Sequence, residues 1–253
     1  GEQGIGDEVM FSSIIPELYA VSSQLLVQCD KRLISLLERS FPTDIIYYPR
    51  GACVPEEQYD FHIPMGSLPL TFRKSLDSFK ASSPEFLKCN MVRAEIIKSQ
   101  LSYKPGKKLV GISWNTKSNL TNSNTRNINL ADLASALDDL DIQLVCLQYG
   151  DVADEIESLK IGFGIDVVQY GDVDNKNDID GLASLIRACD MVVTIDNFTA
   201  HLSAALGVPT KLMLPYRADW RWGNSENRSY WYDALHLYRQ RQVNDWTSAL
   251  AKI

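Results

Sequence analysis

The sequence predicts an α/β fold in which short apolar strands alternate with helices. Five apolar segments of strand length, separated by helical patterns, lie at residues 109–114, 143–148, 166–169, 191–195 and 211–214. Continuous apolar runs of this kind are typical of parallel strands that are covered by helices on both faces. The alternation of strand and helix therefore predicts a doubly wound, Rossmann-like sheet in the C-terminal half of the chain.

The helices between these strands are indicated by the spacing of their apolar residues. Apolar side chains recur at helical spacing at 130, 133, 134, 137 and 140, and a second such set lies at 182, 185, 186 and 189. A polar segment at 152–160 and a segment rich in small residues at 198–206 complete the expected helices.

The N-terminal half predicts a smaller version of the same arrangement. After the glycines of residues 1–6, a helix presents Met10, Ile14, Leu18 and Val21 on one face, and Pro16 is expected to kink it. We expect strands at 25–27, 45–48 and 60–63 and a helix near 30–39. A glycine-rich turn that opens a helix normally follows a strand, and no strand precedes it here, so this Rossmann-like domain is expected to be truncated.

Two domains are expected, at 1–103 and 104–253. The stretch from 82 to 106 carries Pro84 and Pro105 and is the natural linker between them.

Composition excludes several classes of protein. Of 253 residues, 45% are hydrophobic and 23% are charged, as in a folded globular protein. The formal charge of −7 gives no cationic field for nucleic acid. No apolar run reaches the roughly 20 residues of a membrane span, and we see no signal peptide. Five scattered cysteines without a Cys-x-x-Cys pair indicate a reducing compartment, so we expect a cytoplasmic protein.

The strongest candidate site is residues 196–201, which follow an apolar strand and open a helix. In open α/β sheets, ligands bind at the carboxyl ends of the strands. The start of a helix there offers N–H groups and a partial positive charge, which suit a phosphate. The alternative is that Asp196 or Asn197 only caps the helix and that His201 is satisfied within it.

These residues carry a resemblance to a known family. The segment 180–209, with Asp196 and His201 five positions apart, is similar to the nucleotide-sugar site of the family 9 (heptosyltransferase-like) glycosyltransferases. Residues 4–18 resemble the Gly-Asp…Pro-x-Leu opening of that family. Residues 215–232 resemble the branch that occurs behind tetratricopeptide repeats in bacterial proteins.

The resemblance implies a GT-B architecture, in which two Rossmann-like domains with parallel sheets face each other. The N-terminal domain would lie on the acceptor side, and the C-terminal domain would bind a nucleoside-diphosphate sugar. Transfer to an acceptor hydroxyl would be inverting and independent of metal, with no cofactor. The acceptor would be a glycan, a lipid-linked saccharide or a protein, and a repeat domain could lie upstream in the full-length protein.

The resemblance also implies roles for individual residues. Asp7 matches the catalytic aspartate, and a place in the first turn of a helix favours its ionised form, as a general base requires. The alternative is that Asp7 only complements the helix dipole. The residues implied to bind the donor phosphates are Gly4, Gly6, Lys117, Arg126, Asp196, Asn197, Thr199, Ala200 and His201. Those implied for the nucleoside are Gln148, Tyr149, Gly150, Asp180 and Leu182.

Other patterns leave alternatives open. The triplets at 172–174 and 178–180 imitate an Asp-x-Asp metal motif, but short acidic triplets are expected in an acidic chain, so we predict no metal site. Trp220, Trp222 and Trp231 are equally compatible with stacking on a sugar or base and with a packed lid. The family's Ser-Gly-Pro-Met between Asp and His is Asn-Phe-Thr-Ala here, which leaves ADP-, UDP- and GDP-sugars open as donors. The rival functions are a non-catalytic nucleotide-sugar-binding module and a GT-B-fold epimerase.

Overall fold

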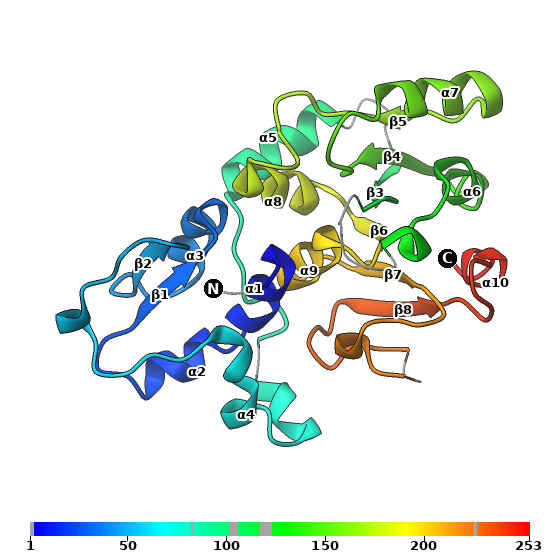
Figure 1. The fold of residues 1–253 in the computed structure, drawn as a ribbon. Coiled ribbons are helices and arrows are strands. Elements are labelled where there is room, and N and C mark those ends of the chain that lie inside the picture. The colour runs from blue at the N-terminus through cyan, green and yellow to red at the C-terminus, as the bar shows by residue number, and fades with distance from the viewer. Residues whose placement is uncertain (1–2, 82, 102–105, 117–122, 225–226) are drawn as a thin grey trace.

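A six-stranded parallel sheet forms the C-terminal half of the molecule (Figure 1). The computed structural model describes residues 3–81, 83–101, 106–116, 123–224 and 227–253. The strand order is β5-β4-β3-β6-β7-β8, and each neighbouring pair is parallel. The strands are β3 (Lys108–Ser113), β4 (Ile142–Cys146), β5 (Val167–Val168), β6 (Met191–Ile195), β7 (Thr210–Leu214) and β8 (Leu235–Arg239). The predicted doubly wound sheet is confirmed.

Helices cover both faces of this sheet. Successive residues of a strand point to opposite faces, so Val192 and Val193 of β6 enter two different cores. The first core is closed by α5 (Met91–Leu101), α8 (Ile179–Ala188) and α9 (Phe198–Ala205), and the second by α6 (Leu130–Ser135), α7 (Ala153–Phe163) and α10 (Thr247–Leu250).

The N-terminal half contains a two-stranded parallel sheet of β1 (Leu26–Cys29) and β2 (Ile46–Pro49). Around it lie α1 (Ile5–Ser12), α2 (Ile15–Ala20), α3 (Ile34–Ser40) and α4 (Pro69–Phe72), with short 3-10 turns η1 (Lys31–Leu33), η2 (Glu56–Gln58), η3 (Met65–Ser67) and η4 (Leu76–Ala81). The predicted kink is confirmed, because the helix breaks after Ser12 and Pro16 occupies the second position of α2, where a missing N–H costs nothing.

Two predictions for this half are wrong. Residues 60–63 form no strand, and Phe61 is 93% exposed, because no neighbouring strand pairs with the segment. The expected linker 82–106 contains α5, whose Ala94, Ile97 and Leu101 are buried in the first core against α8. The boundary near residue 103 stays a prediction, but α5 packs with the large sheet rather than with the small one.

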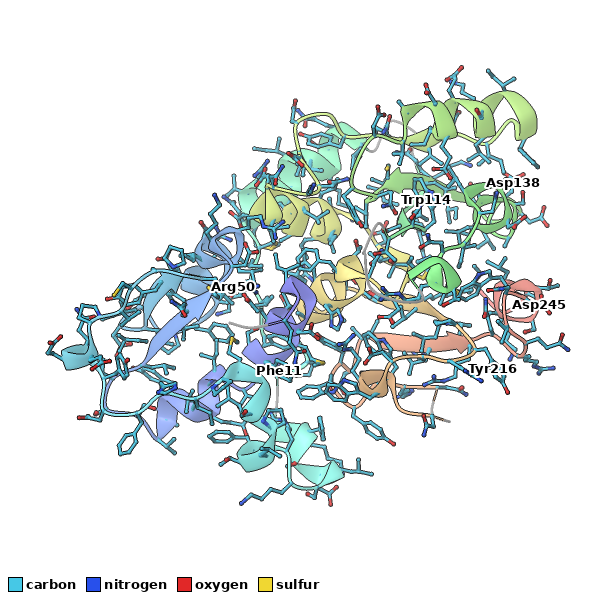
Figure 2. All side chains as sticks on the ribbon, in the orientation of Figure 1. Phe11, Arg50, Trp114, Asp138, Tyr216 and Asp245 are labelled. Carbon is cyan, nitrogen blue, oxygen red and sulfur yellow. The ribbon has the colours of Figure 1, made fainter. Side chains whose placement is uncertain are left out.

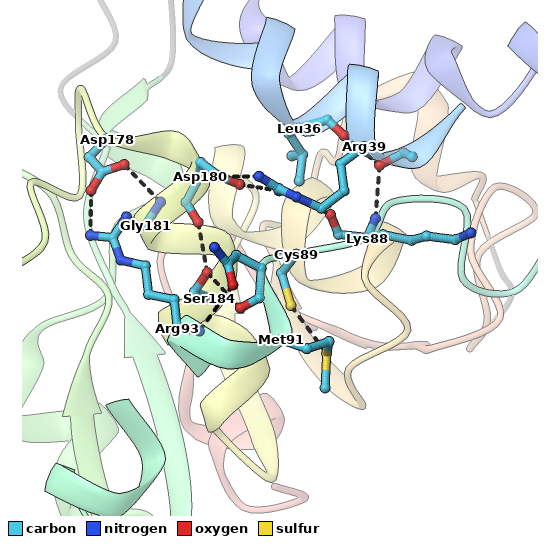
Figure 3. A network of polar contacts seen from close by, with 12 residues as sticks. Leu36, Arg39, Lys88, Cys89, Met91, Arg93, Asp178, Asp180, Gly181 and Ser184 are labelled. Atoms are coloured by element: carbon cyan, nitrogen blue, oxygen red, sulfur yellow. Dashed lines mark hydrogen bonds and ion pairs between the residues drawn. The ribbon is translucent and has the colours of Figure 1, made fainter. Parts of the chain in front are cut away.

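Both halves contribute to one continuous apolar core, and ion pairs reinforce the junction. Arg39 of α3 donates two hydrogen bonds to Asp180 of α8, at 2.5 and 2.8 Å. Arg93 of α5 donates to Asp178 at 2.7 Å, while Asp178 also caps α8 by accepting from the N–H of Gly181 (Figure 3). Asp178 and Asp180, the imitation of a metal motif, are therefore partners of arginines.

We expect Asp180→Asn to lower the free energy of unfolding by about 1 kcal/mol. The substitution weakens the ion pair with Arg39, which joins the two halves through two hydrogen bonds and is only partly exposed. Urea unfolding measures this change. Asp77→Asn is the matched control, because the Lys80–Asp77 pair is nearly fully exposed and should contribute nothing. Equal effects of the two substitutions would contradict a role for Arg39–Asp180 at the junction.

Candidate functional site

The carboxyl ends of β3 and β4 are fixed to each other by Gln148. Its buried Oε1 accepts hydrogen bonds from Ser113 Oγ at 3.1 Å, from the N–H of Trp114 at 3.0 Å and from the N–H of Asn115 at 2.9 Å. Trp114, labelled in Figure 2, directly follows β3. We expected Gln148 to contact the nucleoside, but its side-chain oxygen makes hydrogen bonds that hold the carboxyl ends of β3 and β4 together.

A pocket of about 410 Å³ opens beside Gln148. Its lining residues come from the ends of β4 and β5 and from the loop that follows β5: Cys146, Gln148, Gly150, Gln169, Tyr170, Gly171, Val173, Asp174, Asn175, Lys176 and Asn177. Gln148 and Gly150 were predicted for the nucleoside site, whereas Tyr149 is not in the lining. The loop 169–177 was missed, although a polar, glycine-containing segment after a strand end is itself a signal for a binding loop.

Contacts from two directions hold the pocket loop. Asn175 Nδ2 donates to the carbonyl oxygens of Cys146 and Gln148, at 3.4 and 3.2 Å. From the N-terminal half, Arg32 donates to the carbonyl oxygen of Lys176 at 2.8 Å. Arg32 is itself held by Asp30, whose pKa it lowers. The shape of the pocket therefore depends on both halves.

The start of α9 is capped by Asn197. Its Oδ1 accepts from the N–H of Thr199 at 3.0 Å, and its Nδ2 donates to Ser113 Oγ at 2.8 Å. The N–H of Ala200 donates to the Asn197 carbonyl oxygen at 3.2 Å. Two N–H groups that we expected to meet a phosphate are thus satisfied within the protein, as the capping alternative requires.

Asp196 is a buried carboxylate next to two cations. Trp222 Nε1 donates to its Oδ1 at 2.9 Å, and Arg126 lies 3.7 Å from its Oδ2 while donating to its backbone oxygen at 3.1 Å. Burial raises the pKa of Asp196 above its usual value, and the Trp222 hydrogen bond and the positive charges of Arg126 and Arg221 oppose that rise. Arg126 therefore lies next to Asp196 at the start of α9, and its expected contact with a donor phosphate stays a prediction.

His201 is buried in α9 and packs against aromatic rings. Its Nδ1 shares a hydrogen bond of 2.9 Å with the Tyr232 hydroxyl, and its ring centre lies 5.0 Å from that of Trp222. Burial lowers the pKa of His201 well below 6.5 and raises the pKa of Tyr232 well above 10. The imidazole is neutral and the phenol protonated at neutral pH, so this pair carries no charge to a ligand.

Asp7 lies in the first turn of α1 and reaches across to the C-terminal half. Its Oδ2 accepts from the N–H of Gly4 at 3.0 Å, and its Oδ1 accepts from Arg221 at 2.6 Å. The side chains of Asp7 and Arg221 are only 14% and 13% exposed. Gly6, one residue earlier, lies directly on the His201 ring. The structure therefore brings Asp7, Gly6, His201 and Asp196 into one region. Arg221, for which the sequence predicted no role, and Trp222, which was expected to stack on a ligand or to pack in a lid, also lie there.

Three residues expected in the site lie elsewhere or outside the described residues. Asp180 is bonded to Arg39, and Leu182 is buried in the first core, because the start of α8 faces α3 and α5 rather than the pocket. Lys117 falls outside the described residues. Within the described part of the chain, no cluster of three or more His, Cys, Asp or Glu side chains could hold a metal ion, and no described helix is long and apolar enough to cross a membrane.

Comparison with known proteins identifies the fold. E. coli ADP-heptose lps heptosyltransferase II matches with a TM-score of 0.65 at 14% identity, over 100% of this chain and 93% of that one. A family 9 glycosyl transferase from Veillonella parvula matches at 0.63 and 11%, over 95% and 84% of the two chains. E. coli heptosyltransferase WaaC with ADP-2-deoxy-2-fluoro heptose matches at 0.52 and 12%, over 99% and 95%. The fold is that of the heptosyltransferases.

The resemblance expected from the sequence is thus confirmed for the fold. No protein-family model matches the chain. Protein FlbA of Caulobacter vibrioides is 29% identical over 269 aligned residues, which include the whole of this chain but only 44% of the relative. The chain therefore spans less than half the length of that curated relative, and the association with tetratricopeptide repeats stays a prediction.

We expect Gly6→Ala to destabilise the protein by about 1–3 kcal/mol, because the new Cβ would lie 2.8 Å from His201 Cδ2 in a ring that Tyr232 and Trp222 hold in place. Denaturant unfolding measures the loss. Gly162→Ala in α7 is the control, since a Cβ there meets nothing within 4 Å and alanine favours a helix. Unchanged stability of Gly6→Ala would show that α1 does not press on His201.

The buried His201 also predicts a dependence of stability on pH. The pKa of His201 is lowered in the folded protein. The unfolded chain therefore binds a proton at about pH 6.5 that the folded protein does not bind. The contribution of neutral His201 to the free energy of unfolding is complete above that pH and is lost as the pH falls below it. Urea unfolding at about pH 7 and about pH 5 should therefore show a smaller loss for His201→Gln than for the wild type.

The matched control for this comparison is His236→Gln. His236 is exposed on β8, so its replacement should leave the pH dependence of the wild type intact. If His201→Gln and His236→Gln responded alike, His201 would not be the buried neutral imidazole that the structure shows.

Proposed function

We propose that this chain is a glycosyltransferase that moves a sugar from a nucleoside-diphosphate sugar to an acceptor hydroxyl. The observation that carries the proposal is the position of the Asp7 carboxylate, 2.6 Å from Arg221 of the C-terminal half and beside the start of α9. A carboxylate from one half thus lies at the edge where the other half has its pocket. The fold shared with the heptosyltransferases and with the family 9 protein supports the same conclusion.

The donor would bind along the carboxyl edge of the large sheet. A pocket of about 410 Å³ is of the size that small ligands occupy, and its amide and backbone groups suit a nucleoside. Lys176 in the pocket lining, with Arg126 and Arg221 toward α9, supplies cations for a diphosphate. WaaC binds an ADP-heptose analogue in its solved structure, which supports a nucleotide sugar as the ligand class here.

The proposed reaction is a single displacement. Asp7 takes the proton of the acceptor hydroxyl, the hydroxyl oxygen forms a bond to the anomeric carbon, and the bond from that carbon to the diphosphate breaks. The bonding electrons leave with the nucleoside diphosphate, whose added charge the arginines neutralise. Attack from the face opposite the leaving group inverts the anomeric carbon, and the guanidinium groups take the place that a metal ion fills in other transferases.

A second candidate function is a binding module without catalysis. The specific observation in its favour is that both oxygens of Asp7 already accept hydrogen bonds, from Gly4 and Arg221. Such contacts are what a purely structural carboxylate makes, although each oxygen of Asp7 keeps a second lone pair that can accept a proton.

Calorimetric titration with UDP, GDP and ADP tests donor binding. We expect one diphosphate to bind the wild type and Gly171→Trp to weaken that binding by about tenfold or more, since Gly171 lines the pocket and a Cβ atom there meets nothing within 4 Å. The Gly162→Trp variant, changed at an equally open glycine on α7, should bind as the wild type does. Absence of binding by a folded wild type, or equal binding by Gly171→Trp, would contradict the assigned site.

Asp7→Asn distinguishes the enzyme from the module. We expect this variant to bind the nucleoside diphosphate with unchanged affinity and to release it from the nucleotide sugar about 10²–10⁴-fold more slowly, because the base is gone while the pocket is intact. Measurement of nucleoside diphosphate released under single-turnover conditions reports the rate. Absence of release by both the wild type and Asp7→Asn would favour the module, and equal measurable rates would contradict the role of Asp7 as the base.

A further inference from the structure

Trp220, Trp222 and Trp231 differ sharply in exposure. Trp222 and Trp231 are 1% and 7% exposed, whereas Trp220 is 63% exposed. Trp222 donates to Asp196, and Trp231 packs edge-to-face on Phe79 and Phe11, at 4.9 and 5.8 Å between ring centres. A packed lid therefore accounts for Trp222 and Trp231 and leaves Trp220 unexplained.

Trp220 is presented from a fixed turn. It opens the 3-10 turn η6 (Trp220–Trp222), in which the Asp219 side chain accepts from the N–H of Arg221. Arg239 of β8 donates to the carbonyl oxygen of Trp222 at the other end of the turn. With Trp222 itself buried, the backbone that carries the Trp220 indole is held at both ends, which lowers the entropy cost of using it as a contact surface.

Trp220 contacts Arg221, which in turn is hydrogen-bonded to the candidate base Asp7. The Arg221 guanidinium carbon is 5.8 Å from the centre of the Trp220 ring, and the same guanidinium donates to Asp7 at 2.6 Å. The turn also follows β7 at the carboxyl edge of the large sheet, the edge that carries the pocket and the start of α9. A nucleotide sugar that extends from the pocket to Asp7 would bring its sugar ring to this indole.

We propose that Trp220 is the surface against which the sugar ring of the nucleotide sugar packs. An indole offers a rigid apolar face to the C–H groups of a pyranose, and the neighbouring guanidinium keeps the phosphate end of the donor close. Trp220 belongs to the half that holds the pocket, which favours the donor sugar over the acceptor as its partner. This inference rests on the proposed function, because it assumes that a nucleotide sugar occupies the edge.

The test compares two ligands in four proteins. The dissociation constants of the nucleoside diphosphate that binds and of its nucleotide sugar are measured by calorimetry for the wild type, Trp220→Ala, Trp220→Phe and Phe163→Ala. Phe163, 59% exposed at the end of α7, is the control for loss of an exposed aromatic side chain. We expect Trp220→Ala to weaken nucleotide-sugar binding roughly threefold to tenfold without changing diphosphate binding.

The remaining variants separate stacking from general damage. Trp220→Phe should keep most of the nucleotide-sugar affinity, and Phe163→Ala should keep all of it. If Trp220→Ala weakened both ligands equally, or neither, the inference would be overturned while donor binding, and with it the proposed function, stood. If no diphosphate and no nucleotide sugar bound the folded wild type, the proposed function would fail and this inference with it.

Discussion

The contact between α1 and α9 is the constraint on which the rest of the site depends. Gly6 lies on the His201 ring because a glycine leaves room for it, and the next residue, Asp7, then reaches Arg221. The following residue, the buried Glu8, pairs with Arg50 and accepts from the N–H of Asp30 at 2.6 Å, which ties α1 to the small sheet. One helical turn thus joins the two halves and places a carboxylate between them.

Several polar residues of the segment 196–201 stabilise the candidate site through contacts within the protein. Asp196, Asn197 and His201 are buried and spend their polar atoms on Trp222, Ser113 and Tyr232. Burial shifts the pKa of Asp196 upward and that of His201 downward, so each group disfavours its charged form. A buried network in which each side chain has a hydrogen-bond partner fixes the geometry of the neighbouring side chains. The spacing of residues in a motif can therefore reflect hydrogen bonds within the protein as readily as contacts with a ligand.

The elements that a short window of sequence encodes were predictable. Strand β6 occupies the predicted residues 191–195, because its apolar side chains enter both cores. The position of Asp180 was not predictable, since its partner Arg39 lies 141 residues away and only the folded chain brings them together. The same reason hid the Asp7–Arg221 pair, 214 residues apart, and the pocket loop 169–177, whose role depends on where β5 pairs in the sheet.

In the proposed function, one nucleotide sugar spans the pocket and the junction of α1 with α9. The measurement is a titration of ¹⁵N-labelled protein with UDP, GDP and ADP, and then with the nucleotide sugar of the diphosphate that binds, in which the amide NMR shifts are followed. We expect the diphosphate to shift the amides of Gly150 and Gly171 at the pocket, and its nucleotide sugar to shift in addition those of Gly6 and Asp7 in α1. Shifts confined to residues remote from this edge, such as Phe61 and Phe163, would contradict it.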